Sequence, residues 1–334
     1  LNMEEVQPTI MTAVPRLYET LHARILRGIE RKGYLTKFLF QKTLEIGEKK
    51  YEGDKLSWFE KIINPFLTQI IRKKLQQRFG GRLKSMVSGG APLNYDIGLF
   101  FKALDIELLQ GYGQTEAAPI ISCNLPLNNK IKTVGPPLSD VELKIAEDGE
   151  ILVKGELVMQ GYWNMPEETE NAVKNEWLHT GDIGKIDLEG FLSITDRKKD
   201  IIVNSGGDNI SPQKVEGFLN MQLEIDQSMV FGNGKPHLVA LVVPNEQFIE
   251  EWKNKNKNTY TKEKLILEQT FIRAINSAVD RANDMLSIIE KVRRFCIATE
   301  QFTIENEMLT PSMKIRRHVI LTKYNKALES LYKK

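Results

Sequence analysis

The heptapeptide Gln110-Gly-Tyr-Gly-Gln-Thr-Glu116 directly follows the apolar run Ile106-Glu-Leu-Leu109. A short apolar run that ends in a glycine-rich turn is typical of a strand, so the heptapeptide is predicted to form the loop at the strand's carboxyl end. The ring of Tyr112 between two glycines can lie flat against a purine, and Thr115 and Glu116 carry oxygens that suit phosphate and Mg²⁺. A glycine-rich loop around a buried tyrosine is the simpler interpretation.

A second glycine-rich turn, Ser88-Gly-Gly-Ala-Pro-Leu93, stands about twenty residues earlier. It follows a predicted strand over residues 83–87 and precedes a predicted helix over residues 95–104. In α/β sheets such a turn leaves backbone amides accessible to a ligand, although two glycines equally permit a purely structural turn. The order strand, helix, strand indicates βα units.

The opening third of the chain is predicted to be helical. Leu17, Leu21, Ile25 and Ile29 recur at steps of four residues, and a second apolar series continues to residue 71. Between Lys61 and Tyr95 there are basic residues and no acidic one. This fits either a solvated helix face, the interpretation we favour, or a basic amphipathic face near an anionic membrane or an acidic ligand. The basic residues are Lys61, Arg72, Lys73, Lys74, Arg78, Arg82 and Lys84.

The predicted secondary structure of the remaining chain changes twice. From residue 131 one strand follows another, with a hairpin turning at Asp148-Gly149. After the charged junction 196–200 we expect a helix from Pro212, a hairpin through 232–234, and polar helices to the C-terminus. The predicted fold class is α/β. The predicted domains are 1–130 (helical, then α/β, part of a large domain), 131–198 (a small antiparallel β subdomain) and 199–334 (a small, mobile α+β domain).

Composition narrows the function classes. The 334 residues carry 46 Lys+Arg and 44 Asp+Glu, a formal charge of +2, so no whole-protein field favours nucleic acid, and we expect no nucleic-acid partner. Cys123 and Cys296 form no CxxC pair, and the first residues resemble no signal peptide. We expect a cytoplasmic protein, with contact to the inner face of a membrane as the open alternative noted above.

The pattern Tyr112-Gly-Gln-Thr-Glu116 resembles the adenylate-forming (AMP-binding) superfamily, which activates carboxylates with ATP. Further motifs follow in the family's order along the chain, so the resemblance covers most of it. They are Gly149-Glu-Ile-Leu-Val-Lys-Gly155, Gly161-Tyr-Trp-Asn-Met-Pro-Glu167 with Thr169, His179-Thr-Gly-Asp-Ile-Gly184, Asp196-Arg-Lys-Lys-Asp200, Ser205-Gly-Gly-Asp-Asn-Ile-Ser-Pro212 and Leu309-Thr-Pro-Ser-Met-Lys314. The segments Val14-Pro-Arg-Leu-Tyr-Glu19 and Phe79-Gly-Gly-Arg82 are similar to long-chain fatty acyl-CoA synthetases in particular.

The resemblance implies a two-step reaction with ATP, Mg²⁺ and coenzyme A (CoA) on a long-chain fatty acid. Thr115 and Glu116 would hold phosphate and Mg²⁺, with Glu116 as the metal ligand. Lys314 would promote the first step, and Lys199 would be the hinge that exchanges it for the glycine loop facing CoA. The implied nucleotide- and CoA-binding residues are Gly89, Gly90, Ala91, Pro92, Gln110, Gly111, Tyr112, Gly113, Asp182, Arg197, Ser205, Gly206 and Gly207; of these, Asp182 and Arg197 would bind ribose.

One family motif has no counterpart here. The family's phosphate-binding loop, which ends in Pro-Lys, lies upstream of the segment matched by residues 14–19, and residues 1–14 do not resemble it. We therefore expect the C-terminal portion of a long-chain fatty acid CoA ligase that is inactive without its upstream half. Two alternatives stay open: a non-catalytic nucleotide-binding fragment or pseudoenzyme, and an acyl-AMP ligase that loads a carrier protein instead of CoA.

Overall fold

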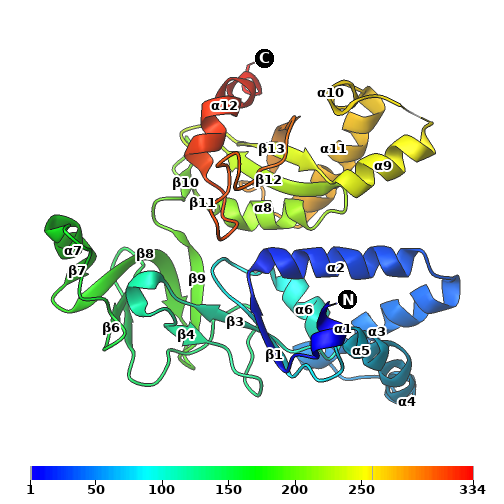
Figure 1. Cartoon of the computed structure of the whole chain (residues 1–334), viewed down its shortest axis with the longest axis horizontal. Helices are drawn as coiled ribbons and strands as arrows, with labels where there is room; N and C mark the ends of the chain where they lie inside the picture. The colour runs from blue at the N-terminus through cyan, green and yellow to red at the C-terminus, as the bar shows by residue number, and fades with distance from the viewer. Residues whose placement is uncertain (1, 258, 334) are drawn as a thin grey trace. The chain divides into compact units, whose positions relative to one another are not determined.

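The computed structural model describes residues 2–257 and 259–333. The chain divides into two compact units, the first ending at Lys198 and the second beginning at Lys199 (Figure 1). Both units contain helices and strands, which confirms the predicted α/β class. Within the described residues no helix is both long and apolar enough to cross a bilayer.

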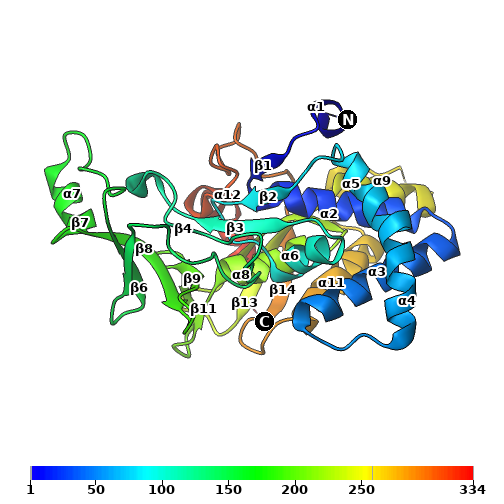
Figure 2. The same ribbon diagram turned by 90° about the horizontal axis from the view of Figure 1, so that it is seen from below.

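Helices dominate the start of the first unit, as the steps of four predicted (Figure 2). Pro15 opens α2 at a position where its missing N–H costs nothing, and a capping box between Ser57 and Glu60 opens α4. The helices are α1 (Asn2–Val6), α2 (Pro15–Glu30), α3 (Tyr34–Glu52), α4 (Trp58–Leu67), the π-helix η1 (Thr68–Arg72), α5 (Lys73–Arg78), α6 (Tyr95–Ala103), the 3-10 helix η2 (Thr115–Ala117) and α7 (Pro166–Ala172).

Helices α3 and α6 pack closely. A Cβ at Gly47 would lie 2.3 Å from the Cα of Ala103, so only glycine permits this approach. Around the contact, the rings of Phe100 and Phe101 pack edge to face, and the ring of Tyr18 in α2 packs edge to face on Phe101. The helices thereby hold α6 beside the strand that follows it.

The first unit has two sheets. One follows the order β1-β2-β3-β4, with β1, β2 and β3 parallel and β4 antiparallel; the other follows the order β5-β6-β8-β7, with β9 paired to β8. The strands are β1 (Ile10–Ala13), β2 (Ser85–Ser88), β3 (Leu108–Tyr112), β4 (Ser122–Cys123), β5 (Glu142–Ile145), β6 (Glu150–Lys154), β7 (Val173–Lys174), β8 (Trp177–Ile186) and β9 (Leu192–Arg197). The hairpin predicted at Asp148-Gly149 is confirmed as β5–β6.

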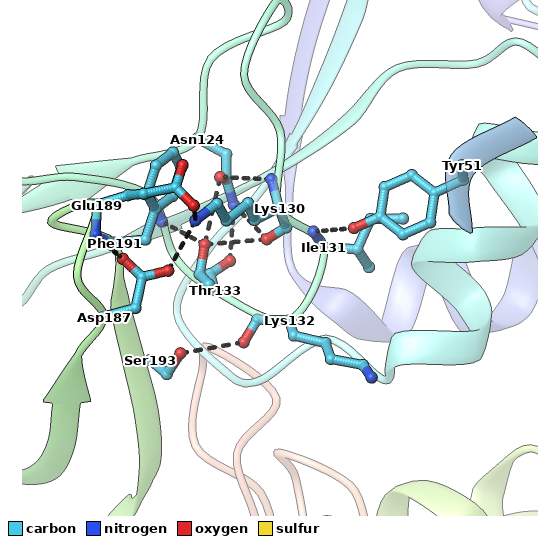
Figure 3. A network of polar contacts seen from close by, with 11 residues as sticks. Tyr51, Asn124, Lys130, Ile131, Lys132, Thr133, Asp187, Glu189, Phe191 and Ser193 are labelled. Atoms are coloured by element: carbon cyan, nitrogen blue, oxygen red, sulfur yellow. Dashed lines mark hydrogen bonds and ion pairs between the residues drawn. The ribbon is translucent and has the colours of Figure 1, made fainter. Parts of the chain in front are cut away.

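A polar network joins the chain between the two sheets to the β8–β9 turn (Figure 3). Lys130 pairs with Asp187 and Glu189, each at 2.8 Å. The side chain of Asn124 accepts from the backbone N–H of Lys130 and donates to the carbonyl of Thr133. The domain border predicted between residues 130 and 131 passes through this network, and that border stays a prediction.

The second unit is built around β13 (Leu238–Pro244), every residue of which is buried. It lies between β12 (Ile225–Phe231) and β14 (Val292–Ile297). Leu238, Ala240 and Val242 pack on the side of α8 and α11, whereas Val239, Leu241 and Val243 pack with α12. Because both faces are covered, the strand is continuously apolar. The other elements are β10 (Ile202–Val203), β11 (Asn209–Ile210), α8 (Pro212–Asn220), α9 (Glu246–Lys255), α10 (Lys262–Leu265), α11 (Gln269–Asp284) and α12 (Arg317–Ser330).

Three expectations need correction. Polar helices do not fill the C-terminal stretch, because β14 pairs in parallel with β13 although Arg293 and Arg294 interrupt its apolar pattern. The strand before the heptapeptide continues through Tyr112, since β4 pairs with its last two residues. Arg72 does not lie on a solvated face: it is fully buried and donates to the carbonyls of Ala103 and Thr43.

Candidate active site

The two glycine-rich turns leave neighbouring strands of one sheet. Strands β2 and β3 are parallel, with Ser88 opposite Gln110, so the turns that follow them emerge at the same edge. The carboxyl edge of a parallel sheet is where α/β proteins bind ligands. The structure thus brings together two segments that the sequence separates by about twenty residues.

The turn after β2 is anchored by hydrogen bonds at both ends, and its middle residues are exposed. Gly89 donates to the carbonyl of Ala13 at the end of β1, and Gly90 has a positive φ of 83°. At its far end Leu93 N donates to Gln110 Oε1, and Gln110 Nε2 donates to the carbonyl of Ile131 at 2.6 Å. The Gln110 side chain therefore braces the turn, while Gly90, Ala91 and Pro92 are exposed.

Two buried polar atoms in these turns have no hydrogen-bond partner. They are Ser88 Oγ, whose residue is 1% exposed, and Gln114 Nε2. Buried polar groups are paired in the large majority of cases, so two unpaired atoms in adjacent turns fit a site whose ligand supplies hydrogen bonds.

Tyr112, Asp182 and Arg197 form a polar triad, in which Tyr112 and Asp182 are buried and Arg197 is exposed. The Tyr112 hydroxyl donates to Asp182 Oδ2 at 2.7 Å, and Arg197 Nε donates to Asp182 Oδ1 at 3.1 Å. Burial, followed by the charge of Asp182, raises the pKa of Tyr112, so its phenol keeps its proton at neutral pH. A carboxylate has about four acceptor positions, which leaves about two on Asp182 for the hydroxyls of a sugar.

Strands β8 and β9 position this triad. Asp182 stands opposite Arg197 in their antiparallel register. Glu150 of β6 accepts from Gly181 N at 2.9 Å and lies 3.3 Å from both His179 Nδ1 and Lys198 Nζ. Burial would raise the pKa of Glu150, but these hydrogen bonds outweigh it and lower that pKa. The carboxylate thus fixes the backbone directly before Asp182.

The end of the heptapeptide meets a second motif. Tyr162 donates to Glu116 Oε1 at 2.8 Å, and the backbone N–H of Met159 donates to the Glu116 carbonyl at 2.9 Å. Thr115 is exposed beside them. A Cβ at Gly113 would lie 1.7 Å from the carbonyl oxygen of Pro119, so this tight return of the chain requires glycine.

Glu116 is the candidate metal ligand. Among the described residues, no three His, Cys, Asp or Glu side chains form a metal-binding group. Mg²⁺ usually takes one or two carboxylates and completes its shell with water and substrate phosphates. A single partly exposed carboxylate therefore fits Mg²⁺ carried in with a nucleotide and fits no dedicated protein cage.

In the second unit, the predicted glycine loop is the turn between β10 and β11. Asn204 Oδ1 accepts from the backbone N–H of Gly206 and Asp208, each at 2.9 Å. Gly207 has a φ of 87°, and Ser205 N donates to the carbonyl of Lys235. The turn is exposed, and both the Asn204 side chain and the backbone bond to Lys235 fix its form.

Lys314 closes a small loop before α12. Its N–H donates to Thr310 Oγ1 at 3.0 Å, and its carbonyl accepts from Thr310 N at 2.8 Å. Three residues later, Arg317 donates through two nitrogens to both carboxylate oxygens of the buried Glu216, at 2.7 and 2.8 Å. This pair fastens the lysine loop to α8.

The predicted site residues therefore fall into two groups. Those in the first unit gather around Tyr112 and Asp182, whereas Ser205, Gly206, Gly207 and Lys314 belong to the second unit, and the hinge candidate Lys199 is its exposed first residue. Residue patterns did not single out Tyr162, Glu150, Glu216 or Arg317. Tyr162 and Glu150 stand inside quoted motifs, but their partners are 46 and 31 positions distant.

These observations define the class of protein. It consists of an α/β unit with a ligand site at the carboxyl edge of its sheet, followed by a small α+β unit. Residues 1–163 match the family model "AMP-binding enzyme", and residues 199–334 match "AMP-binding enzyme C-terminal domain". The chain belongs to this family of AMP-binding, adenylate-forming enzymes, as the motifs indicated.

The chain is similar to long-chain fatty acid CoA ligases. It is 33% identical over 332 residues to the long-chain-fatty-acid–CoA ligase FadD15 of Mycobacterium tuberculosis (strain ATCC 25618 / H37Rv), covering 98% of the chain and 55% of that protein. It is 28% identical over 346 residues to fatty acyl-CoA synthetase B of Dictyostelium discoideum, covering 98% and 51%. The chain spans about half the length of the curated relatives it matches.

Solved structures share the fold. The adenylation domain of a carboxylate reductase from Mycobacterium chelonae matches with a TM-score of 0.74 at 22% identity, over 100% of this chain and 48% of that one. The adenylation domain of a carboxylic acid reductase from Segniliparus rugosus, in complex with AMP and a co-purified carboxylic acid, matches with a TM-score of 0.68 at 22% identity, over 99% and 48%.

Proposed function

We propose that the chain carries the adenylate-binding and thioester-forming parts of a long-chain fatty acid CoA ligase. The observation that carries the proposal is the Tyr112–Asp182–Arg197 triad beside two glycine-rich turns of one sheet edge. Adenine would rest between Tyr112 and the backbone of residues 89–92, and the ribose hydroxyls would take the remaining acceptor positions of Asp182. The unpaired Ser88 Oγ and Gln114 Nε2 support a ligand in this place.

In the first step a fatty acid carboxylate oxygen bonds to the α-phosphorus of ATP. The bond from that phosphorus to the bridging oxygen breaks, and pyrophosphate leaves as acyl-AMP forms. The Lys314 ammonium would offset the repulsion between the carboxylate and the α-phosphate. Mg²⁺, when bound, would neutralise phosphate charge, with Glu116 as its protein ligand and Thr115 beside it on the phosphates.

In the second step the CoA thiol, losing its proton, bonds to the acyl carbon. The bond from this carbon to the phosphate oxygen breaks, and AMP leaves. Rotation about Lys199 would withdraw Lys314 and bring the loop Ser205–Gly207 to the thiol. The exposure of that loop supports this role, because a pantetheine chain can approach residues 205–207 without displacing other side chains.

Binding of AMP tests the nucleotide part of the proposal. Isothermal titration calorimetry measures the Kd of AMP for the 334-residue chain and for its Asp182→Asn variant. The Kd of the variant should be about tenfold higher or more, since hydrogen bonds to a charged group contribute about 1.5–3 kcal/mol. The matched control is Asp187→Asn, an exposed aspartate in the β8–β9 turn whose carboxylate pairs with Lys130. Equal affinity of the Asp182 variant and the wild type would contradict the assignment.

Product formation separates the candidate functions. Palmitate, ATP and CoA are supplied to the chain alone and to the chain joined to its natural upstream sequence, and palmitoyl-CoA is measured. Product from the longer protein only is expected. Product from the 334 residues alone would refute the need for an upstream half, and its absence from both would leave AMP binding without catalysis as the function. Acyl transfer to a carrier protein in preference to CoA would favour the acyl-AMP ligase.

A cytoplasmic location accompanies this proposal. Cys123 and Cys296 are free thiols, and burial raises the pKa of both, so neither is primed for oxidation. This fits a reducing compartment. Fractionation of cells producing the chain, with a cytoplasmic marker enzyme, tests it.

A further inference from the structure

We propose that the outer face of α4 and η1 is a docking surface for an anionic lipid membrane. Five large apolar side chains are exposed there, each between 41% and 74%, although an ordinary surface helix exposes such residues singly. They are Trp58, Phe59, Ile62, Phe66 and Ile70. This inference rests on these side chains alone and is independent of the proposed catalytic function.

The helix carries two apolar series, and the protein core accounts for only one. Leu67 and Ile71 are buried, and Ile63, one step of four earlier, is partly buried. Trp58, Ile62, Phe66 and Ile70 also recur at steps of four and face outward. Figures 1 and 2 place α4 at the outer margin of the helices of its unit. The outward series therefore covers none of the described core.

The exposed charged residues of α4 and α5 are all basic. Lys61, Lys73, Lys74 and Arg78 are exposed on α4 and α5, and no acidic residue occurs between residues 61 and 95. Glu60, just before, is engaged by Lys49 at 2.6 Å and by the Ser57 N–H at 2.8 Å. Exposed lysines beside an apolar stripe complement anionic lipid, each contributing about 1 kcal/mol near the surface.

The same features disfavour a protein occupant. A second copy docked isologously would set this patch against itself, bringing lysine against lysine across the two-fold axis. Cores of protein interfaces are depleted in lysine, whereas membrane interfaces favour tryptophan at the level of the headgroups. Trp58 is 74% exposed and meets Phe59 edge to face, so an indole and a phenyl ring are presented together.

Co-sedimentation with vesicles tests the surface. The 334-residue chain should partition onto phosphatidylcholine vesicles that contain phosphatidylglycerol and should not partition onto pure phosphatidylcholine. The double variant Ile62→Ser/Phe66→Ser should lower the partition constant at least about tenfold. Lys73→Ser/Lys74→Ser should lower it about tenfold or more and weaken its dependence on salt. The control is Trp163→Ser, which removes an aromatic side chain outside the patch that is 88% exposed.

A second measurement does not depend on the folding of the apolar variant. Brominated lipid should quench the fluorescence of Trp58, obtained as the difference between wild type and Trp58→Phe. Partition that is unchanged in Ile62→Ser/Phe66→Ser, or absence of quenching, would overturn the proposal. So would self-association that this double variant abolishes without any vesicle binding, since the face would then belong to a second copy. If the chain joined to its upstream sequence no longer partitioned onto vesicles, the upstream sequence would be what covers this face. That result would also overturn the proposal.

Discussion

The Tyr112 hydroxyl donates a 2.7 Å hydrogen bond to Asp182, a residue 70 positions further along the chain. Tyr112 ends a strand of the first sheet and Asp182 lies in the second, so one bond ties the edge that carries the glycine-rich turns to the strand that presents the carboxylate. Both side chains are buried. Their geometry fixes the spacing between the expected adenine and ribose positions before any ligand arrives, which lowers the cost of ordering the site on binding.

Replacing Tyr112 by Phe should therefore weaken both fold and ligand binding. The change leaves Asp182 Oδ2 without its buried donor, and we expect a loss of about 1.5–3 kcal/mol in the free energy of unfolding. Urea titration followed by circular dichroism measures it, and AMP affinity should fall in parallel. Full stability together with full affinity would show that the bond has no such role.

Acid should destabilise the first unit through His22. This buried ring packs edge to face on Phe100 at 4.5 Å, and burial lowers its pKa from 6.5 to about 4. The unfolded chain therefore binds the proton first: the stabilisation is complete above pH 6.5 and is lost as pH falls toward 4, by up to about 1.4 kcal/mol per pH unit. Urea titrations from pH 7 to pH 4 measure the slope.

The matched variants separate this effect from other titrations. His22→Leu should flatten the stability profile between pH 6.5 and 4, whereas His318→Leu, at an exposed position on α12, should leave it as steep as in the wild type. An unchanged slope in His22→Leu would rule out His22 as the source.

Arg72 should be a large contributor to the stability of the helical region. Its buried guanidinium donates to the Ala103 and Thr43 carbonyls and to Asn64 Oδ1, joining η1 to α3, α4 and the end of α6. Arg72→Met should cost about 3 kcal/mol, because it removes these hydrogen bonds and the ion pair with Asp105. Lys73→Met, one residue on and exposed, should stay within about 0.5 kcal/mol. Similar losses in both variants would contradict the assigned network.

The Glu216–Arg317 pair should stabilise the second unit and its lysine loop. Glu216 is buried, and its two oxygens accept from the two terminal nitrogens of Arg317. Glu216→Gln removes the negative charge from this bidentate pair, and we expect a loss of about 3 kcal/mol in thermal or urea unfolding. The control is Glu329→Gln, which breaks the more exposed pair with Lys235 and should cost at most about 1 kcal/mol. Equal costs would refute the buried anchor.

Periodicity predicted the type of most elements correctly. Steps of four identified the opening helices, and alternation with a turn pair identified the β5–β6 hairpin, because both signals are local. Periodicity did not predict strand β14. The adjacent arginines interrupt its apolar pattern, and its partner strand, β13, is about fifty residues earlier in the chain. Periodicity also placed Arg72 on the surface, because a charged side chain in a helix is solvated unless distant carbonyls receive it.

The sequence by itself determined the family, the order of its motifs and the residue types available for chemistry, since these are written in short contiguous runs. Only the tertiary structure decided which of them meet. The parallel pairing of β2 with β3 sets the two glycine-rich turns at one edge, and the β8–β9 register sets Arg197 beside Asp182. Tyr162 and Glu116 likewise meet only through folding. Such contacts depend on strand order and packing over tens of residues, and no local spacing encodes that order.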